Sequence, residues 1–180
     1  DRGRKVANTS SADLYIFKAP KEKATGYGVV ILPGGSYRTV GFSTMFAEWL
    51  RDNGVTAAVL KYRLPNYGHI DASFEDGAGA VKYFRDNAER LNLDRNKIGI
   101  CGSSAGGHLA AYVAAAAKGD ERPDFSILIY GAMIRSVFWA GFDATQRIVG
   151  KDITAEKVKA MDITDMVDET HPPTLLLLSD

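Results

Sequence analysis

Short apolar runs alternate along the chain with longer stretches in which apolar residues recur every three or four positions. A short apolar run is typical of a strand buried on both faces, whereas the longer periodicity is typical of an amphipathic helix. The runs predict strands over residues 14–17, 28–32, 55–60, 97–101, 125–130 and 174–178. The periodic stretches predict helices over residues 44–53, 71–90 and 104–118. This alternation indicates a doubly wound, mostly parallel sheet with helices on both faces.

Residues at the predicted boundaries support these elements. Ser43 can cap the helix over 44–53, and Gly54 and Gly119 are suited to end the first and third helices. Residues 14–17 alternate only weakly between apolar and polar, which is expected of a strand at the edge of the sheet.

The stretch from Gly131 to Thr170 departs from the alternation, since it is mixed polar and aromatic with short helical pieces near Gln146 and Glu156. It follows the carboxyl end of a predicted strand, where open α/β sheets bind ligands. We therefore expect either a small cap over the site or an ordinary surface crossover. The apolar run over 175–178 is followed by no predicted turn or helix, so residues 1–180 are expected to form a single domain that lacks its C-terminal portion.

The composition excludes several classes of protein. Twenty-two Lys and Arg residues balance 22 Asp and Glu residues, whereas a nucleic-acid-binding protein would show a basic excess. With 46% apolar residues the chain can form a core, and no apolar run approaches the roughly 18 residues that span a membrane. Cys101 is the single cysteine and is expected to pack in the core. The three histidines lack metal-ligand spacing, so no metal or other cofactor is expected.

The most informative segment combines Gly102, Ser104 and Gly106 in a Gly-x-Ser-x-Gly pattern. It lies between the strand over 97–101 and a predicted helix, which is the context of a nucleophile elbow. Such a turn lifts the central hydroxyl above the sheet, and the glycines leave room for the neighbouring backbone. A dinucleotide-binding fingerprint would need glycine at position 104, and a phosphate-binding P-loop would need Lys and then Ser or Thr after Gly107. The pattern thus favours Ser104 as a nucleophile.

A second glycine-rich segment follows an earlier buried strand. Pro33, Gly34, Gly35 and Ser36 come directly after the strand over 28–32, on the edge of the sheet that carries the elbow. Acyl transfer requires two backbone N–H donors for the tetrahedral oxyanion. One usually belongs to the residue after the nucleophile, here Ala105, and the other to a loop of this kind. The alternative is a plain Pro-Gly-Gly turn.

Together these segments resemble a known family, the α/β-hydrolase esterases and lipases of the acetyl-xylan-esterase and feruloyl-esterase-like type. The resemblance covers roughly residues 26–180 and includes the helix that begins near Asp76. It rests on Pro33-Gly34-Gly35-Ser36-Tyr37, Leu60-Lys61-Tyr62-Arg63-Leu64-Pro65, Gly102-Ser103-Ser104-Ala105-Gly106-Gly107-His108-Leu109-Ala110 and Pro172-Pro173-Thr174.

The resemblance implies a serine carboxylester hydrolase that acts on small-molecule or polysaccharide esters, such as acylated plant polysaccharides, and is often secreted or periplasmic. Ser104 matches the nucleophile, and the backbone N–H groups of Gly35 or Ser36 and of Ala105 match the oxyanion hole. Ser36 stands where the family often has a third glycine; its backbone donor remains, although the hydroxyl could alter the pocket.

The general base is harder to assign. His108 lies one turn behind Ser104 and is expected to pack or hydrogen-bond beneath the loop, and His171 precedes the last strand at the wrong edge of the sheet. His69 lies in a turn ahead of the elbow, whereas this fold places the histidine last. Asp180 follows the last strand and is a candidate acid, although the family's acid usually falls slightly later. The base is therefore expected beyond residue 180, in a missing segment or a second polypeptide.

Two other functions compete with ester hydrolysis. A serine peptidase of the prolyl-oligopeptidase type shares the elbow, but only a short segment precedes the first predicted strand here. The second alternative is a catalytically inactive fragment or binding module, which the lack of a competent histidine favours. Labelling of Ser104 by a fluorophosphonate would distinguish a working site from an inactive one.

Overall fold

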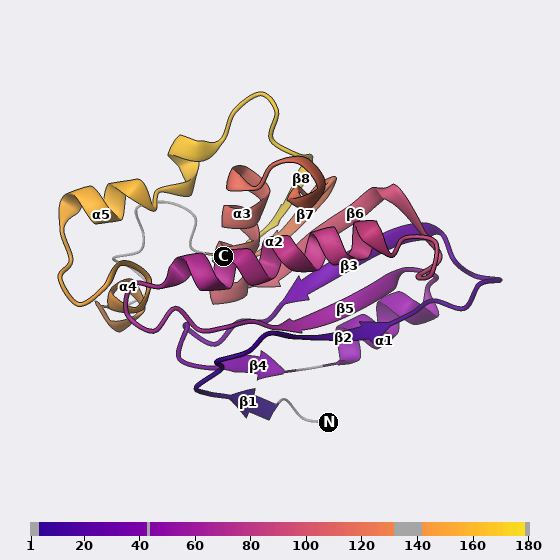
Figure 1. Cartoon of the computed structure of the whole chain (residues 1–180), viewed down its shortest axis with the longest axis horizontal. Coiled ribbons are helices and arrows are strands. Elements are labelled where there is room, and N and C mark those ends of the chain that lie inside the picture. Colours follow the sequence, from indigo (N-terminus) through magenta and orange to yellow (C-terminus); the bar gives the residue numbers. More distant parts are fainter. Residues whose placement is uncertain (1–3, 43, 132–141, 179–180) are drawn as a thin grey trace.

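We describe residues 4–42, 44–131 and 142–178 from a computed structural model of the chain (Figure 1). A six-stranded sheet in the order β2-β5-β3-β6-β7-β8 forms its centre, and β1 and β4 pair in a separate two-stranded sheet. The strands are β1 (Arg4–Val6), β2 (Asp13–Phe17), β3 (Gly26–Leu32), β4 (Val40–Phe42), β5 (Thr56–Lys61), β6 (Leu93–Ser103), β7 (Phe125–Ile129) and β8 (Thr174–Leu177). The helices are α1 (Met45–Asp52), α2 (Ile70–Asp86), α3 (Ala105–Ala116), η1 (Gly119–Glu121), α4 (Phe142–Val149), α5 (Ala155–Ala160) and η3 (Ile163–Met166).

The sheet is parallel except at one edge, which confirms the predicted architecture. Strands β5, β3, β6, β7 and β8 run parallel, and β2 pairs with β5 in the antiparallel direction. Strand β5 is buried on both faces: Ala57 and Val59 pack with α1, whereas Ala58 and Leu60 belong to the larger core beneath α2 and α3. Helices therefore cover both faces, as expected of a doubly wound sheet.

Several observed boundaries differ from the predicted ones. Strand β6 begins at Leu93, ahead of the predicted residue 97. The prediction started late because residues 94–96 are polar and exposed and show no apolar pattern. Helix α2 ends at Asp86, four residues early. Helix α1 begins at Met45 with Thr44 at its N-cap, and the predicted cap Ser43 lies outside the described residues. Strands β1 and β4 were not predicted, because three-residue strands are too short to show a period.

The part of the segment 131–170 that the structure describes contains α4, α5 and η3, in agreement with the helical pieces predicted near Gln146 and Glu156. The chain then enters β8, which is confirmed as a strand. Its side chains are exposed, since Leu175 and Leu176 each retain 53% of their accessible surface. In the described chain β8 is an edge strand. Its apolar side chains are therefore not buried on both faces of the sheet, although their composition is typical of a buried strand.

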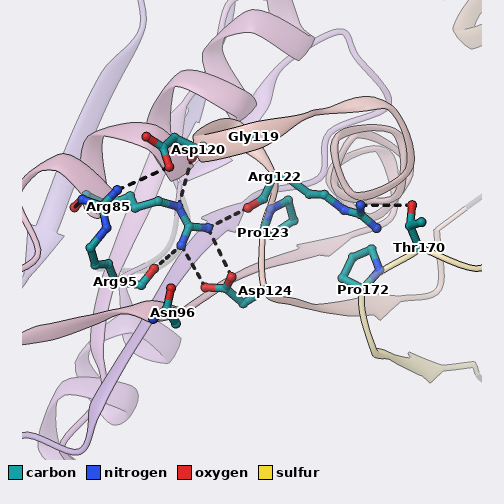
Figure 2. A pocket seen from close by; sticks show the side chains of 10 residues that line it. All are labelled: Arg85, Arg95, Asn96, Gly119, Asp120, Arg122, Pro123, Asp124, Thr170 and Pro172. Carbon is teal, nitrogen blue, oxygen red and sulfur yellow. Dashed lines mark hydrogen bonds and ion pairs between the residues drawn. The ribbon is translucent and has the colours of Figure 1, made fainter.

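A buried arginine joins the elements at the amino end of the sheet (Figure 2). Arg85, near the end of α2, is 5% exposed and donates to the carbonyl oxygens of Asp120 and Arg122 and to the carboxylate of Asp124. Asp124 in turn accepts the backbone N–H of Ile98 on β6 at 2.8 Å. The planar guanidinium can bind several acceptors at once, so Arg85 fixes α2 against β6 and the approach to β7.

Candidate active site

The turn between β6 and α3 has the geometry of a nucleophile elbow. Strand β6 ends at Ser103 and helix α3 begins at Ala105, so Ser104 alone makes the reversal. Its backbone adopts φ 52° and ψ −123°, which a residue with a side chain rarely adopts. Ser104 is partly exposed, and the first N–H groups of α3, which begin directly after it, have no intrahelical acceptors. The turn thus presents a hydroxyl beside oriented donors at the carboxyl edge of the sheet.

The two outer glycines of the elbow are required by close backbone contacts. A Cβ at Gly106 would lie 2.0 Å from the carbonyl oxygen of Leu32 on β3. A Cβ at Gly102 would lie 2.1 Å from the carbonyl oxygen of Gly106. Neither neighbour is a flexible side chain that could move aside, so the strand and helix pack this closely only because both residues lack a Cβ.

The glycine-rich loop after β3 lies against the elbow. Strands β3 and β6 are neighbours, with Leu32 opposite Gly102, so their carboxyl ends are adjacent. A Cβ at Gly34 would lie 3.1 Å from the Cβ of Ser104. Gly35 has φ 144°, and its carbonyl oxygen accepts hydrogen bonds from Arg38 and Thr39, which closes the turn. The structure therefore brings the loop that contains Gly35 and Ser36 next to Ser104 and Ala105.

Buried tyrosines hold this loop from below. The Tyr37 hydroxyl lies 2.7 Å from Nδ1 of His108 on α3, and both side chains are buried, at 2% and 4% exposure. Tyr62, after β5, donates from its hydroxyl to the carbonyl oxygen of Pro33 at 2.7 Å. Burial raises the pKa of Tyr37 well above its ordinary value, so the hydroxyl keeps its proton. His108 therefore hydrogen-bonds beneath the loop, as expected.

Sequence reasoning missed the roles of Tyr37 and Tyr62. The sequence identifies Tyr37 only as the end of the Pro33-Gly34-Gly35-Ser36-Tyr37 segment, and no periodicity in the sequence pairs it with His108, 71 positions away. The single available signal is the position of Tyr37 directly after Pro33-Gly34-Gly35-Ser36, where a side chain can turn inward beneath the loop.

Burial of His108 leads to a prediction about acid stability. Burial lowers the pKa of the imidazole from 6.5 to about 4, and the hydroxyl bonded to its Nδ1, that of Tyr37, is neutral. Between these pH values the unfolded chain binds a proton that the folded chain does not. The free energy of unfolding should therefore fall as the pH drops from 6.5 to 4, by about 3 kcal/mol from this group.

Urea unfolding at pH 7, 5.5 and 4 measures this loss. The matched variant is His108→Asn, which removes the titrating imidazole and keeps a hydrogen-bond acceptor for Tyr37. Its unfolding free energy should fall less steeply over the same interval. If the unfolding free energies of the wild type and His108→Asn fell equally between pH 7 and pH 4, the acid sensitivity could not be assigned to His108.

The remaining predicted residues do not complete a triad. His69 is exposed at the N-terminus of α2. His171 precedes β8 at the amino end of the sheet, with Nδ1 3.0 Å from the carbonyl oxygen of Pro172, and β8 runs parallel to β7 and β6. Asp180 lies outside the described residues. The structure thus brings together Ser104, Ala105 and the loop, and neither His69 nor His171 joins them.

Helix α4 is fixed to the outer side of the glycine-rich loop. Asp143 accepts from Nε of Arg38, in the loop, at 2.7 Å and from Nε of Arg147, on α4, at 2.8 Å. A polar recess of about 370 Å³ lies beside this contact, and Arg38, Arg63, His69 and Arg147 contribute to its lining. The recess shown in Figure 2, about 390 Å³, lies at the opposite end of β6 from Ser104.

The described residues offer neither a metal-binding cluster nor a membrane-spanning helix. Those residues contain no group of three His, Cys, Asp or Glu side chains placed to hold a metal ion. Among the same residues, no helix combines the length and apolar character of a membrane span. Cys101 is buried as expected, and burial raises its pKa to about 12, so the thiol stays protonated.

The sheet order, the strained serine turn and the adjacent glycine loop define an α/β-hydrolase fold. The solved structure of an acetyl ester-xyloside bifunctional hydrolase from Caldicellulosiruptor lactoaceticus matches with a TM-score of 0.78 and 26% identity, covering 97% of this chain and 74% of that chain. The BD-FAE family model matches residues 13–129, which include β2 through β7. The chain therefore belongs to the BD-FAE family.

Curated relatives are similar over part of the chain. An acetylxylan esterase of Xylanibacter ruminicola is 34% identical over 114 residues, which are 61% of this chain and 23% of that protein. Probable carboxylesterase 6 of Arabidopsis thaliana is 33% identical over 102 residues, which are 53% of this chain and 30% of that protein. The matches thus span less than a third of either relative's length.

Proposed function

We propose that the protein is a serine carboxylester hydrolase with Ser104 as nucleophile. The observation that carries the proposal is the approach of Gly34 to Ser104, which places the loop of Gly35 and Ser36 beside the strained elbow. In this proposal the N–H of Ala105 and an N–H of Gly35 or Ser36 are the donors to the oxyanion. Hydrogen-bond donors fixed in advance at such a position stabilise the transition state without reorganisation.

The reaction would proceed by acyl transfer to water. The Oγ of Ser104 attacks the ester carbonyl carbon while a base accepts its proton, and the negative charge on the carbonyl oxygen is held by the backbone donors. The bond to the alcohol oxygen then breaks, and the alcohol leaves with the proton returned by the base. Water attacks the acyl-enzyme in the same way and releases the acid. We propose a histidine outside this sequence as base, with Asp180 or a near neighbour as the acid that orients it.

Acetyl or similar short or aromatic acyl esters, including those on carbohydrate, are the proposed substrates. Support comes from the names of relatives, an acetylxylan esterase and a carboxylesterase, and from the solved hydrolase with acetyl ester and xyloside in its title. We further propose that residues 131–170 form a small cap. The ion pair between Arg38 and Asp143 supports this proposal, since it holds α4 against the oxyanion loop.

Labelling with a fluorophosphonate probe tests the proposed nucleophile directly. The full-length protein is expected to form one adduct, which peptide mass spectrometry should locate on Ser104, and to hydrolyse p-nitrophenyl acetate. Comparison with a chromogenic proline-containing peptide separates an esterase from a peptidase. A folded protein that is inert to the probe and to the ester would favour the inactive binding module.

A further inference from the structure

The strongest feature that the proposed reaction does not use is the buried pair of Tyr37 and His108. Tyr37 belongs to the glycine-rich loop, and His108 lies one turn along α3 from Ser104. Their hydrogen bond of 2.7 Å therefore joins the loop that carries one proposed oxyanion donor to the helix that carries the other. The two rings also meet edge to face, with centroids 5.8 Å apart.

The local backbone shows why such a connection is needed. Ser36 and Tyr37 both have positive φ, at 53° and 55°, although neither is glycine. Residues in this region persist only where the surroundings hold them there. Tyr62 fixes the start of the loop through Pro33, and Gly41 donates to the carbonyl of Gly34. The Tyr37 hydroxyl is the side-chain contact that holds the tip of the loop to α3.

The direction of the hydrogen bond follows from the unpaired atoms. Within the described chain, Nε2 of His108 is buried without a hydrogen-bond partner. If Nδ1 donated to Tyr37, the Tyr37 proton and the Nε2 lone pair would both be left without partners. If Tyr37 donates to Nδ1, only the Nε2 proton is left. Unpaired buried groups are costly, so the second arrangement, with His108 neutral and protonated on Nε2, is favoured.

We propose that Tyr37 and His108 are positioning residues of the oxyanion hole: the Tyr37 hydroxyl donates to Nδ1 of His108 and so fixes the amides of Gly35 and Ser36 relative to Ala105. This inference rests on the proposed hydrolase function. It adds that the hydrogen bond between the two side chains sets the spacing of the two oxyanion donors. A displacement of about 1 Å in such a donor can lower a rate by about a hundredfold. The role is exerted through the loop, with no contact to the reacting atoms.

The first test is the variant Tyr37→Phe of the full-length protein. This substitution removes the phenolic hydroxyl and leaves the ring in place. We expect kcat for p-nitrophenyl acetate to fall by about 10- to 100-fold with little change in KM, because the loop would act on the transition state more than on the bound ester. Labelling by the fluorophosphonate should slow in parallel. The control is Tyr112→Phe, the same change on α3 at a residue that packs on Phe74. Its kcat should stay within about twofold of the wild type.

The second test compares two substitutions of the histidine. His108→Asn keeps an acceptor near the position of Nδ1, and His108→Leu removes it. Both delete the imidazole ring, so both should lower the melting temperature. If the hydrogen bond positions the loop, His108→Asn should keep most of the kcat and His108→Leu should match Tyr37→Phe. Equal kcat for the two variants at equal stability would overturn the proposal.

A measurement independent of turnover separates this inference from the proposed function. Hydrogen exchange of the amides over residues 34–39 should be faster in Tyr37→Phe and His108→Leu than in the wild type, Tyr112→Phe or His108→Asn. A wild-type protein that hydrolyses no ester would end the proposed function, whereas the exchange result would still report on the loop. Unchanged exchange and unchanged kcat in Tyr37→Phe would refute the positioning role while leaving the hydrolase intact.

Discussion

Ser104→Ala is expected to lower the hydrolysis of p-nitrophenyl acetate by about 10⁵- to 10⁶-fold in the full-length protein. The reason is that the variant has no oxygen to form the acyl-enzyme, so only the oxyanion donors and substrate binding remain. The melting temperature should change little, because the substituted side chain is only partly buried and Ala can retain the existing backbone. Initial rates with burst-phase analysis would measure the loss.

The matched control is Ser103→Ala, the same chemical change one position earlier at the end of β6. Ser103 is the last residue of β6 and pairs in parallel register with Ile129, whereas Ser104 makes the turn into α3. Ser103→Ala should retain activity within a few-fold and should still be labelled by a fluorophosphonate. Turnover that survives in Ser104→Ala but is lost in Ser103→Ala would move the nucleophile to the neighbouring serine.

Gly106→Ala is expected to produce the largest loss of stability among single-methyl additions to the elbow. The added Cβ would lie 2.0 Å from the carbonyl oxygen of Leu32 and 2.6 Å from that of Pro33. Both are backbone atoms of β3 and the loop after it, so α3 must move away from the sheet. The free energy of unfolding should decrease by about 3 kcal/mol or more, since overpacking against rigid backbone has no cheap relaxation. Urea unfolding followed by circular dichroism measures the change.

Gly79→Ala supplies the comparison for that experiment. Gly79 lies within α2, and a Cβ there would meet no atom within 4 Å. Alanine is a better helix former than glycine, so this variant should be unchanged or more stable by up to about 1 kcal/mol. If both glycine variants unfolded at the same urea concentration, the close contact between α3 and β3 would not be a constraint on the fold.

The parts of the site that follow a strand were predictable from the sequence. Apolar runs predict β3 and β6, and the glycine patterns after them predict that Gly35 and Ser104 lie at the same edge of the sheet, in agreement with the pairing of Leu32 with Gly102. These predictions depend on local sequence alone, because a tight turn after a buried strand requires glycine independently of the tertiary structure. The edge position of β2 was predicted for a similar reason, its weak alternation.

The contacts that hold the site together were not predictable in the same way. The pairing of Tyr37 with His108 and the many hydrogen bonds of Arg85 join residues far apart in the chain, and no periodic pattern marks either. Strand β8 shows the converse problem. Its leucines have the composition of a central strand, yet their burial depends on neighbours that composition does not specify. Tertiary packing decides such features, so they become visible only in three dimensions.

The backbone at position 104 has a consequence for attempts to make the protein more robust. A left-handed conformation strains serine but not glycine, so Ser104→Gly would relax the bend that begins α3. Selection for heat resistance alone would favour that exchange and discard the hydroxyl with it. Directed evolution of this scaffold therefore has to screen for turnover in every round, because replacing the proposed nucleophile would increase the stability of the fold.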